Sequence, residues 1–273
     1  MKLAEVPLQI VANRPVVEVT VEGKPARFLL DTGASGLLVT ESAVQRLGLQ
    51  YDLQFTGSST SLGAHALSRL TTPVVLHVGS FELKPARFGV VQSATDLSPQ
   101  SGVDGLLGTG VLAAYDVDVD MPGGHIVLNE PRRCPAGAPP FEGPSTTFNV
   151  PPNPRMYFYV PARVDDRDLF LLVDTGANRT YVNEARIGLG GSELGGDRTV
   201  SVRSAGPGGL NARLHRFDRF QLGREVRRNV NILVGPLRTD GDGLLGTDYL
   251  RRRRIWLSFA GWTITIQQPG AEQ

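Results

Sequence analysis

The sequence predicts a mainly β fold, in which two homologous, closed-barrel-like lobes are related by a pseudo-twofold axis and helices are few and short. Three observations predict it. The apolar runs are short, alternating or rich in β-branched residues, and separated by turn residues. The two halves of the chain repeat the same order of motifs. A Pro- and Gly-rich segment without helical or strand periodicity lies between them.

Individual elements follow from local patterns. Three runs are typical strands: "VVEVTV" (16–21), "YFYVPARV" (157–164) and "WTITI" (262–266). The stretch "TESAVQRLGL" (40–49) predicts a helix, because its first residue is a good N-cap and its Gly suits the end.

Each half opens with the same motif. "RPVVEVTVEGKPARFLLDTGAS" (14–35) and "RMYFYVPARVDDRDLFLLVDTGAN" (155–178) both read as strand, turn, apolar strand and Asp-Thr-Gly-Ala. Farther on come "VDGLLGTGVL" (103–112) and "GDGLLGTDYL" (241–250), each expected to lead into a short helix. The spacing is similar in the two halves, which indicates a genuine internal repeat.

Each half then ends in a predicted hairpin, at 116–128 and 254–266. We therefore expect an N-terminal lobe at 1–128, a linker at 129–147 and a C-terminal lobe at 148–273. The symmetry that most dimers obtain from two chains would be built into one, so a monomer is expected.

Composition excludes several classes of protein. The chain has 273 residues and a formal net charge of +1, so no global field points to nucleic acid. No apolar run has the length of a membrane span. The single Cys, Cys134, excludes internal disulfides, and the four His lack ligand spacing, so a metal site of Cys/His type is not expected. No organic cofactor is implied by the sequence either. The start carries no signal-peptide core, which fits a cytoplasmic chain, or a periplasmic or secreted one whose leader was removed.

The repeated carboxylates are the candidate catalytic groups. Asp31 and Asp174 each follow an apolar run, where an unpaired charge is costly. If the pseudo-twofold axis passes between them, the two carboxyls share one proton and act as acid and base at once. Such a pair can add water to an amide without a covalent intermediate.

The neighbouring residues suit this task. Gly33 and Gly176 allow tight turns whose amides can orient the carboxylates. The hydroxyls of Thr32 and Thr175 could cross the axis and bond the opposite turn.

With two Asp-Thr-Gly-Ala turns and two Gly-Leu-Leu-Gly elements in register, the chain resembles the aspartic peptidases of the pepsin and retropepsin clan. The resemblance implies an acid-protease-like bilobal fold and identifies Asp31 and Asp174 with the catalytic pair. It also implies that each "GLLG" crosses under a catalytic turn. The short lobes look closer to retroviral subunits than to pepsin, in a single-chain form.

Two departures from the family pattern affect the expected chemistry. Ala34 and Ala177 stand where pepsin-type enzymes carry a hydroxyl, which predicts a dyad that releases protons less readily and a mildly acidic to neutral optimum. Ser35 and Asn178 stand where retroviral enzymes have an Asp that holds the substrate backbone.

The family's substrate-covering flap would lie between the catalytic turn and "GLLG". Candidates are 56–68 and 201–213, both rich in Gly and Ser; ordinary exposed hairpin tips are the alternative. Three residues are candidates for substrate binding: Ser35, Asn178 and, in the first segment, Gly63.

Other conspicuous residues have structural explanations. Asp104 and Asp242, which precede "GLLG", are expected to be turn residues, since only two carboxylates fit on the axis. The run "RRRR" (251–254) is expected to be a solvated face rather than a nucleic-acid site.

The sequence thus predicts an aspartic endopeptidase whose partner is a peptide or protein substrate, without nucleic-acid or membrane binding. Two alternatives stay open. One is a catalytically silent peptide-binding or regulatory module on the same fold, and the other is an enzyme that processes only its own chain or one partner.

Overall fold

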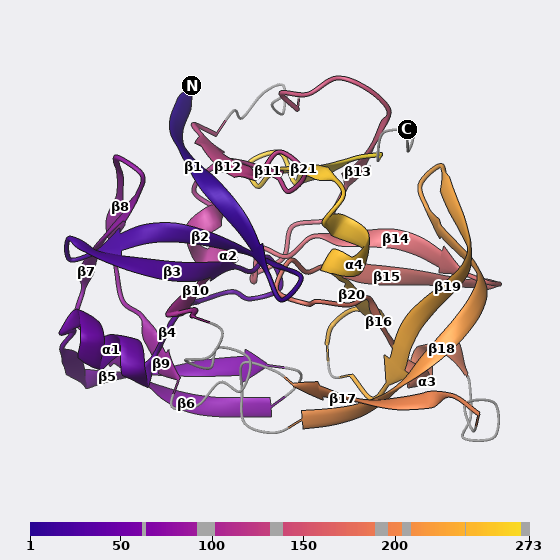
Figure 1. Cartoon of the computed structure of the whole chain (residues 1–273), viewed down its shortest axis with the longest axis horizontal. Helices are drawn as coiled ribbons and strands as arrows, with labels where there is room; N and C mark the ends of the chain where they lie inside the picture. The colour runs from indigo at the N-terminus through magenta and orange to yellow at the C-terminus, as the bar shows by residue number, and fades with distance from the viewer. Residues whose placement is uncertain are drawn as a thin grey trace.

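The computed structural model describes residues 1–61, 64–91, 102–131, 139–188, 196–203, 209–237 and 239–268. These residues form mostly strands, with short helices between them (Figure 1). The predicted mainly β, two-lobed fold is confirmed, with the first half of the chain on one side of the molecule and most of the second half on the other (Figure 1).

The first half contains these elements: β1 (Lys2–Val11), β2 (Arg14–Val21), β3 (Lys24–Leu30), β4 (Leu37–Thr40), α1 (Glu41–Leu47), β5 (Tyr51–Ser61), β6 (Ala64–Thr71), β7 (Val74–Val78), β8 (Phe81–Ala86), β9 (Gly89–Val91), β10 (Gly105–Leu107), α2 (Thr109–Leu112), β11 (Asp116–Asp120) and β12 (His125–Asn129). The predicted helix is present as α1. Its N-cap Thr40 accepts a bond from the Ala43 amide, and it ends at Gly48, whose φ is 72°.

The second half contains these elements: β13 (Ser145–Asn149), β14 (Tyr159–Val164), β15 (Arg167–Val173), β16 (Tyr181–Asn183), α3 (Glu184–Ile187), β17 (Arg198–Arg203), β18 (Gly209–Leu222), β19 (Glu225–Gly235), β20 (Gly243–Leu245), α4 (Thr247–Leu250), β21 (Arg254–Ser258) and β22 (Thr263–Gln267). The short helices expected after each "GLLGT" are α2 and α4, whereas α3, with Asn183 as its N-cap, has no counterpart among the sequence predictions.

The second lobe is a closed barrel. Its strands pair in the ring β14–β15–β20–β16–β19–β18, and β18 pairs back to β14. The first lobe repeats this order as β2–β3–β10–β4–β9–β6, with β7 paired to β2. In the first lobe, the counterpart of the long strand β18 is divided into β6 and β7. Thr72 and Pro73 separate these two strands, because proline has no amide proton to donate to a sheet.

The two halves also share one sheet. The predicted terminal hairpins, β11–β12 and β21–β22, are present, and β11 pairs with β21 from Asp116↔Ser258 to Asp120↔Arg254. Strand β13 adds to β22 at the end of this sheet, so its first three residues fall in the segment assigned above to the linker. The proposed domain boundaries stay a prediction. One apolar core cluster contains residues of both halves, among them Leu30 and Val173, which directly precede the two Asp-Thr-Gly turns.

The "RRRR" prediction is wrong for two of its arginines. Arg253 is buried and pairs with Glu225 at 2.5 Å. Arg254 forms two bonds to the buried carboxylate of Asp118, at 2.9 and 2.6 Å. The run was predicted to be solvated because no acidic partner lies close to it in the sequence. Its partners, Glu225 and Asp118, come from distant strands. Within the described residues, no helix is long and apolar enough to cross a membrane.

Candidate active site

Each Asp-Thr-Gly turn follows directly from a central strand. Asp31 comes after β3 and Asp174 after β15, which enter from opposite sides of Figure 1. The "GLL" strands run parallel to them, β10 beside β3 and β20 beside β15. The Asp31 amide donates to the Leu107 carbonyl at 2.9 Å, and the Asp174 amide donates to Leu245 at 3.0 Å. The repeated "GLLG" elements therefore hold the backbone of both turns.

The acids that precede "GLLG" support the same framework. The Asp104 carboxylate accepts the Arg27 amide, and the Asp242 carboxylate accepts the Phe170 amide, both at 2.9 Å. Each also pairs with an arginine of the nearby helix, Arg46 or Arg186. These acids fix the strands before the Asp-Thr-Gly turns, as expected for structural residues.

Two threonines lock the turns to each other. The Thr32 hydroxyl donates to the Val173 carbonyl, and the Thr175 hydroxyl donates to the Leu30 carbonyl, both at 2.6 Å. Each hydroxyl also accepts the backbone amide of the other threonine at 3.1 Å. Both side chains are buried. The two lobes are thus joined directly beneath the acids by a symmetric set of four hydrogen bonds.

The structure brings the two carboxyls together. They are close enough for one to donate a hydrogen bond to the other when one carboxyl is protonated. A methyl group added at Gly33 would lie 2.4 Å from the Asp174 carboxyl carbon, and one added at Gly176 would lie 2.3 Å from that of Asp31. Any side chain at these positions would displace the opposite acid, so glycine is required here for close approach.

Burial raises the pKa of both acids. For Asp31, burial comes first and the Asp174 charge second, and together they hold its pKa well above the usual value of 3.8. Burial also raises the pKa of Asp174, although bonds from the Ala177 and Gly176 amides act in the opposite direction. One proton is therefore retained by the pair at a pH where an ordinary carboxyl is ionised.

The two acids are not equivalent. The Asp174 carboxylate accepts amides from Gly176 at 2.9 Å and Ala177 at 3.0 Å, whereas Asp31 accepts one, from Gly33 at 2.9 Å. More amide bonds stabilise the ionised form. The amide bonds therefore favour the charge on Asp174 and the shared proton on Asp31.

Two residues near the acids were missed by sequence reasoning. The β2–β3 and β14–β15 registers, extended by two positions, place Arg14 opposite Asp31 and Tyr157 opposite Asp174. The Arg14 charge lowers the pKa of both acids. Burial raises the pKa of the Tyr157 hydroxyl, which bonds Ser35 and senses the charges of both acids. The signal was their matching place, seventeen positions before each Asp.

The predicted substrate-binding residues have different surroundings. The exposed Ser35 bonds Tyr157, a residue of the other lobe. The Asn178 carbonyl accepts the side-chain amide of Asn13 at 2.7 Å, also across the lobes. Gly63 lies outside the described residues. Sequence reasoning gave Ser35 and Asn178 no such part in joining the lobes, because their partners belong to the other half of the chain.

Both flap candidates belong to hairpins. Strands β5 and β6 pair from Tyr51↔Thr71 to Ser61↔Ala64, and β17 pairs with β18 from Arg198↔Leu214 to Arg203↔Gly209. The hairpins approach from opposite sides along the lower edge of Figure 1. Their tips, 62–63 and 204–208, are outside the described residues.

A comparison with protein-family models gives two matches to a single model, described as aspartyl protease, at residues 17–111 and 160–249. The two matched regions contain the two Asp-Thr-Gly turns and the two "GLLG" elements. Together they cover more than half of the chain. No curated protein matches the sequence.

Proposed function

This chain belongs to the aspartyl protease family, and from that premise we propose that it is an aspartic endopeptidase, with Asp31 and Asp174 as its catalytic pair. The observation that carries the proposal is the close approach of these two carboxyls, one from each lobe, each packed against the glycine of the opposite turn. The substrate would be an extended peptide that lies between the lobes and is held by main-chain hydrogen bonds.

The asymmetry of the pair supports an assignment of roles. The Asp174 carboxylate takes a proton from a water molecule, whose oxygen forms a bond to the carbonyl carbon of the scissile amide. Asp31 gives its proton to the carbonyl oxygen, which yields a neutral gem-diol. Asp174 then returns its proton to the amide nitrogen as the carbon–nitrogen bond breaks, and Asp31 recovers a proton from one gem-diol hydroxyl. Both acids end as they began.

The raised pKa values support activity at mildly acidic to neutral pH. Catalysis on this scheme needs one proton on the pair and is lost at high pH when that proton leaves. Because the pKa of Asp31 lies well above 3.8, this loss is displaced upward. A rate profile with its maximum near pH 2 contradicts this part of the proposal.

The test is replacement of either acid. Asp31→Asn and Asp174→Asn are each expected to lower kcat for a mixed peptide library by at least about 1000-fold, on the scale of general acid–base catalysis. The control is Asp168→Asn, which changes an exposed carboxylate of the C-terminal lobe and is expected to keep full activity. Heat protection of the wild type by a statine inhibitor would show binding at the pair. Binding of peptides without cleavage at any pH would favour a silent binding module instead.

A further inference from the structure

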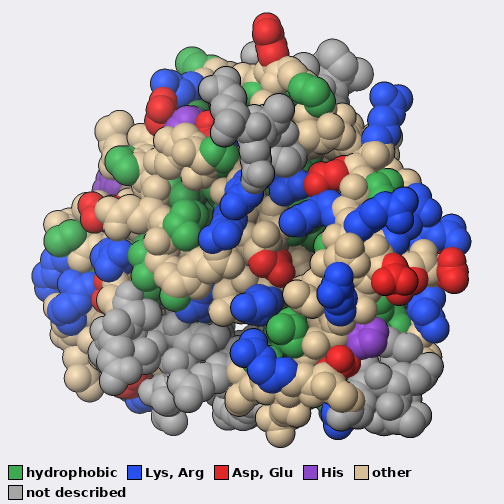
Figure 2. Space-filling view, turned by 45° about the vertical axis from the view of Figure 1, so that its right-hand side comes forward, with side chains coloured by type: hydrophobic (Ala, Val, Ile, Leu, Met, Phe, Trp, Pro, Cys, Tyr) green, Lys and Arg blue, Asp and Glu red, His purple; other side chains and the backbone are tan. Residues whose placement is uncertain are grey.

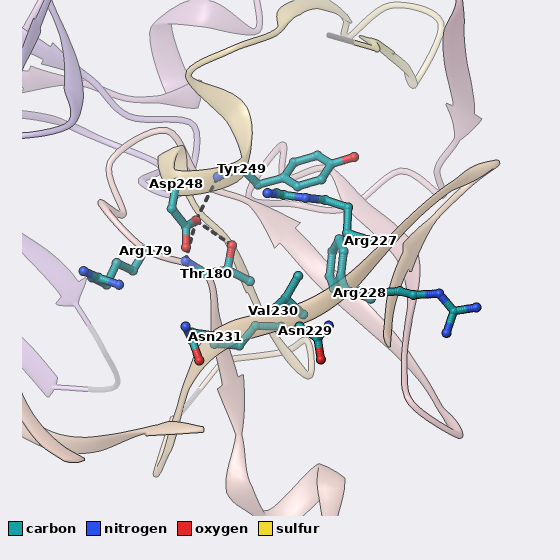
Figure 3. Close-up of a pocket in the computed structure, with 11 residues that line it drawn as sticks. Arg179, Thr180, Arg227, Arg228, Asn229, Val230, Asn231, Asp248 and Tyr249 are labelled. Carbon is teal, nitrogen blue, oxygen red and sulfur yellow. Dashed lines mark hydrogen bonds between the residues drawn. The ribbon is translucent and has the colours of Figure 1, made fainter. Parts of the chain in front are cut away.

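A hollow of about 340 Å³ lies in the C-terminal lobe, between strand β19, the residues that follow the second catalytic turn, and helix α4 (Figure 3). The aspartic peptidase mechanism above does not use it. Its walls combine cationic side chains with apolar ones, and these residues characterise it: Arg179, Arg227, Arg228, Phe220, Val230 and Ile232.

The arginines of the hollow differ from other arginines of the fold in their ion pairing. Elsewhere in the fold arginines pair with acids, as Arg46 does with Asp104 and Arg186 with Asp242. By contrast, none of the arginines of the hollow has an ion pair with any residue that the structure describes. All three are exposed. Figure 2 shows Lys and Arg side chains gathered on the right-hand part of the molecule.

The one acid in the hollow does not cancel them. One Asp248 oxygen accepts the amide and hydroxyl of Thr180, at 2.8 and 2.7 Å, and the Tyr249 amide at 2.9 Å (Figure 3). Burial, the largest influence, raises the pKa of this carboxyl. Asp248 therefore bonds the local backbone and also interacts with the charge of Arg179, but with three arginines beside this acid the lining presents a net positive charge to a ligand.

The arrangement of the cations favours an extended ligand. In Figure 3, Arg179 and Arg228 point away from each other at opposite ends of the hollow, with Arg227 between them. The Arg227 guanidinium lies 5.8 Å from the centre of the Tyr249 ring. The three guanidinium groups are thus spread along the hollow in this view, an arrangement that suits a chain with several carboxylates.

The hollow also adjoins the catalytic turn. Arg179 is five residues after Asp174, and five residues span at most about 18 Å even when fully extended. The Thr180 carbonyl accepts the Leu233 amide at 3.1 Å, which fastens this segment to β19. A span of about 18 Å corresponds to about six residues of an extended substrate strand, at about 3.3 Å per residue.

We propose that this hollow is an exosite for an acidic segment of the peptide substrate, within about six residues of the cleaved bond. The proposal rests on the proposed peptidase function. The apolar wall suits the stems of Glu side chains, while the guanidinium groups bind their carboxylates. A nucleic acid fits less well, because it needs a long basic surface to follow its backbone, and the chain's net charge is only +1.

Binding is tested first, because it does not depend on turnover. A fluorescent peptide with a neutral core and a run of six Glu is titrated against the Asp31→Asn protein by anisotropy, beside a matched peptide with six Gln. The Glu peptide is expected to bind roughly threefold to tenfold more tightly, on the scale of two or three exposed charge contacts. Equal binding of the two peptides overturns the proposal, as does tighter binding of a single-stranded oligonucleotide.

Matched variants locate the effect. Added to the Asp31→Asn protein, Arg227→Gln with Arg228→Gln should remove the preference for Glu, whereas Arg227→Lys with Arg228→Lys should keep most of it. The control is Arg167→Gln with Arg224→Gln, which removes the same charge from the same lobe outside the hollow. A preference that survives the first pair, or is lost equally in the control, overturns the assignment to this hollow.

Cleavage separates this proposal from the catalytic one. With active enzyme, the Glu-flanked peptides, placed on either side of the same core, should show a lower KM on one side and an unchanged kcat. If neither Glu nor Gln peptide is cleaved while the Glu peptide binds as described, the peptidase proposal fails and the exosite stands. If the Glu and Gln peptides are both cleaved, and their KM values are equal whichever side of the core carries the run, the exosite proposal fails and the peptidase proposal stands.

Discussion

Replacing Thr175 by Val should weaken the joint between the lobes far more than the loss of one hydroxyl elsewhere. Valine has the same shape, so no cavity forms. The change leaves the Leu30 carbonyl and the Thr32 amide without the partners they have at 2.6 and 3.1 Å. An orphaned buried polar group costs about 1–3 kcal/mol, so two cost about 4 kcal/mol. For a protein of this size that lowers Tm by about 8–16 °C.

Calorimetry on matched variants tests the reasoning. Thr265 is also buried, and its hydroxyl bonds the exposed Thr147 at 2.8 Å, so Thr265→Val leaves a partner that water can satisfy. Its expected cost is about 1 kcal/mol. Thr175→Ser keeps the hydroxyl and should melt near the wild type, which provides a reading even if the Val variant does not fold. A Thr175→Val melt within about 2 °C of Thr265→Val would refute the argument.

Three other predictions follow from buried groups. Because the pKa of Asp31 is raised in the folded state, wild-type stability is lost as pH rises from about 3.8 through the folded value. The Asp31→Asn protein should therefore have a higher Tm than the wild type at pH 7 and the same Tm at pH 3. A lower Tm than the wild type at pH 7 would contradict this. Arg253→Met strands Glu225, bonded at 2.5 and 2.7 Å, and should cost about 3 kcal/mol in a denaturant titration; no midpoint change would show that the pair is not desolvated. Gly105→Ala puts a methyl 2.4 Å from the Leu38 carbonyl oxygen and should cost about 1–3 kcal/mol, whereas Gly196→Ala, with open space around it, should cost little; equal melts would contradict the crowding.

The sequence predicted what depends on local pattern and repetition. Short stretches of a few residues were enough to predict the N-cap and the terminal Gly of α1, the short helices after each "GLLGT" and the terminal hairpins. The contact between Asp31 and Asp174 was predictable for a different reason. Two copies of one motif imply two copies of one turn, and an axis between two turns brings identical residues together.

What the sequence did not reveal depends on pairing between distant segments. Arg253 looked exposed because nothing near it in the chain suggests Glu225 as a partner. Tyr157 and Arg14 precede the motif and fit no local chemical pattern, so only the strand register brings them to the acids. The cations of the hollow come from strand β19 and from the segment after the second Asp-Thr-Gly turn, and their lack of ion pairs with the described residues is visible only once the other arginines have been paired.

The sheet shared by the two halves sets a limit on how this molecule can be divided. Were the chain split into separately produced lobes, each piece would bare a row of amide and carbonyl groups, along β11 in one and β21 in the other. Unpaired backbone groups of this kind form hydrogen bonds with exposed strands of other molecules. A lone lobe is therefore expected to self-associate or aggregate, and the native fold is expected only when both pieces pair along these two strands.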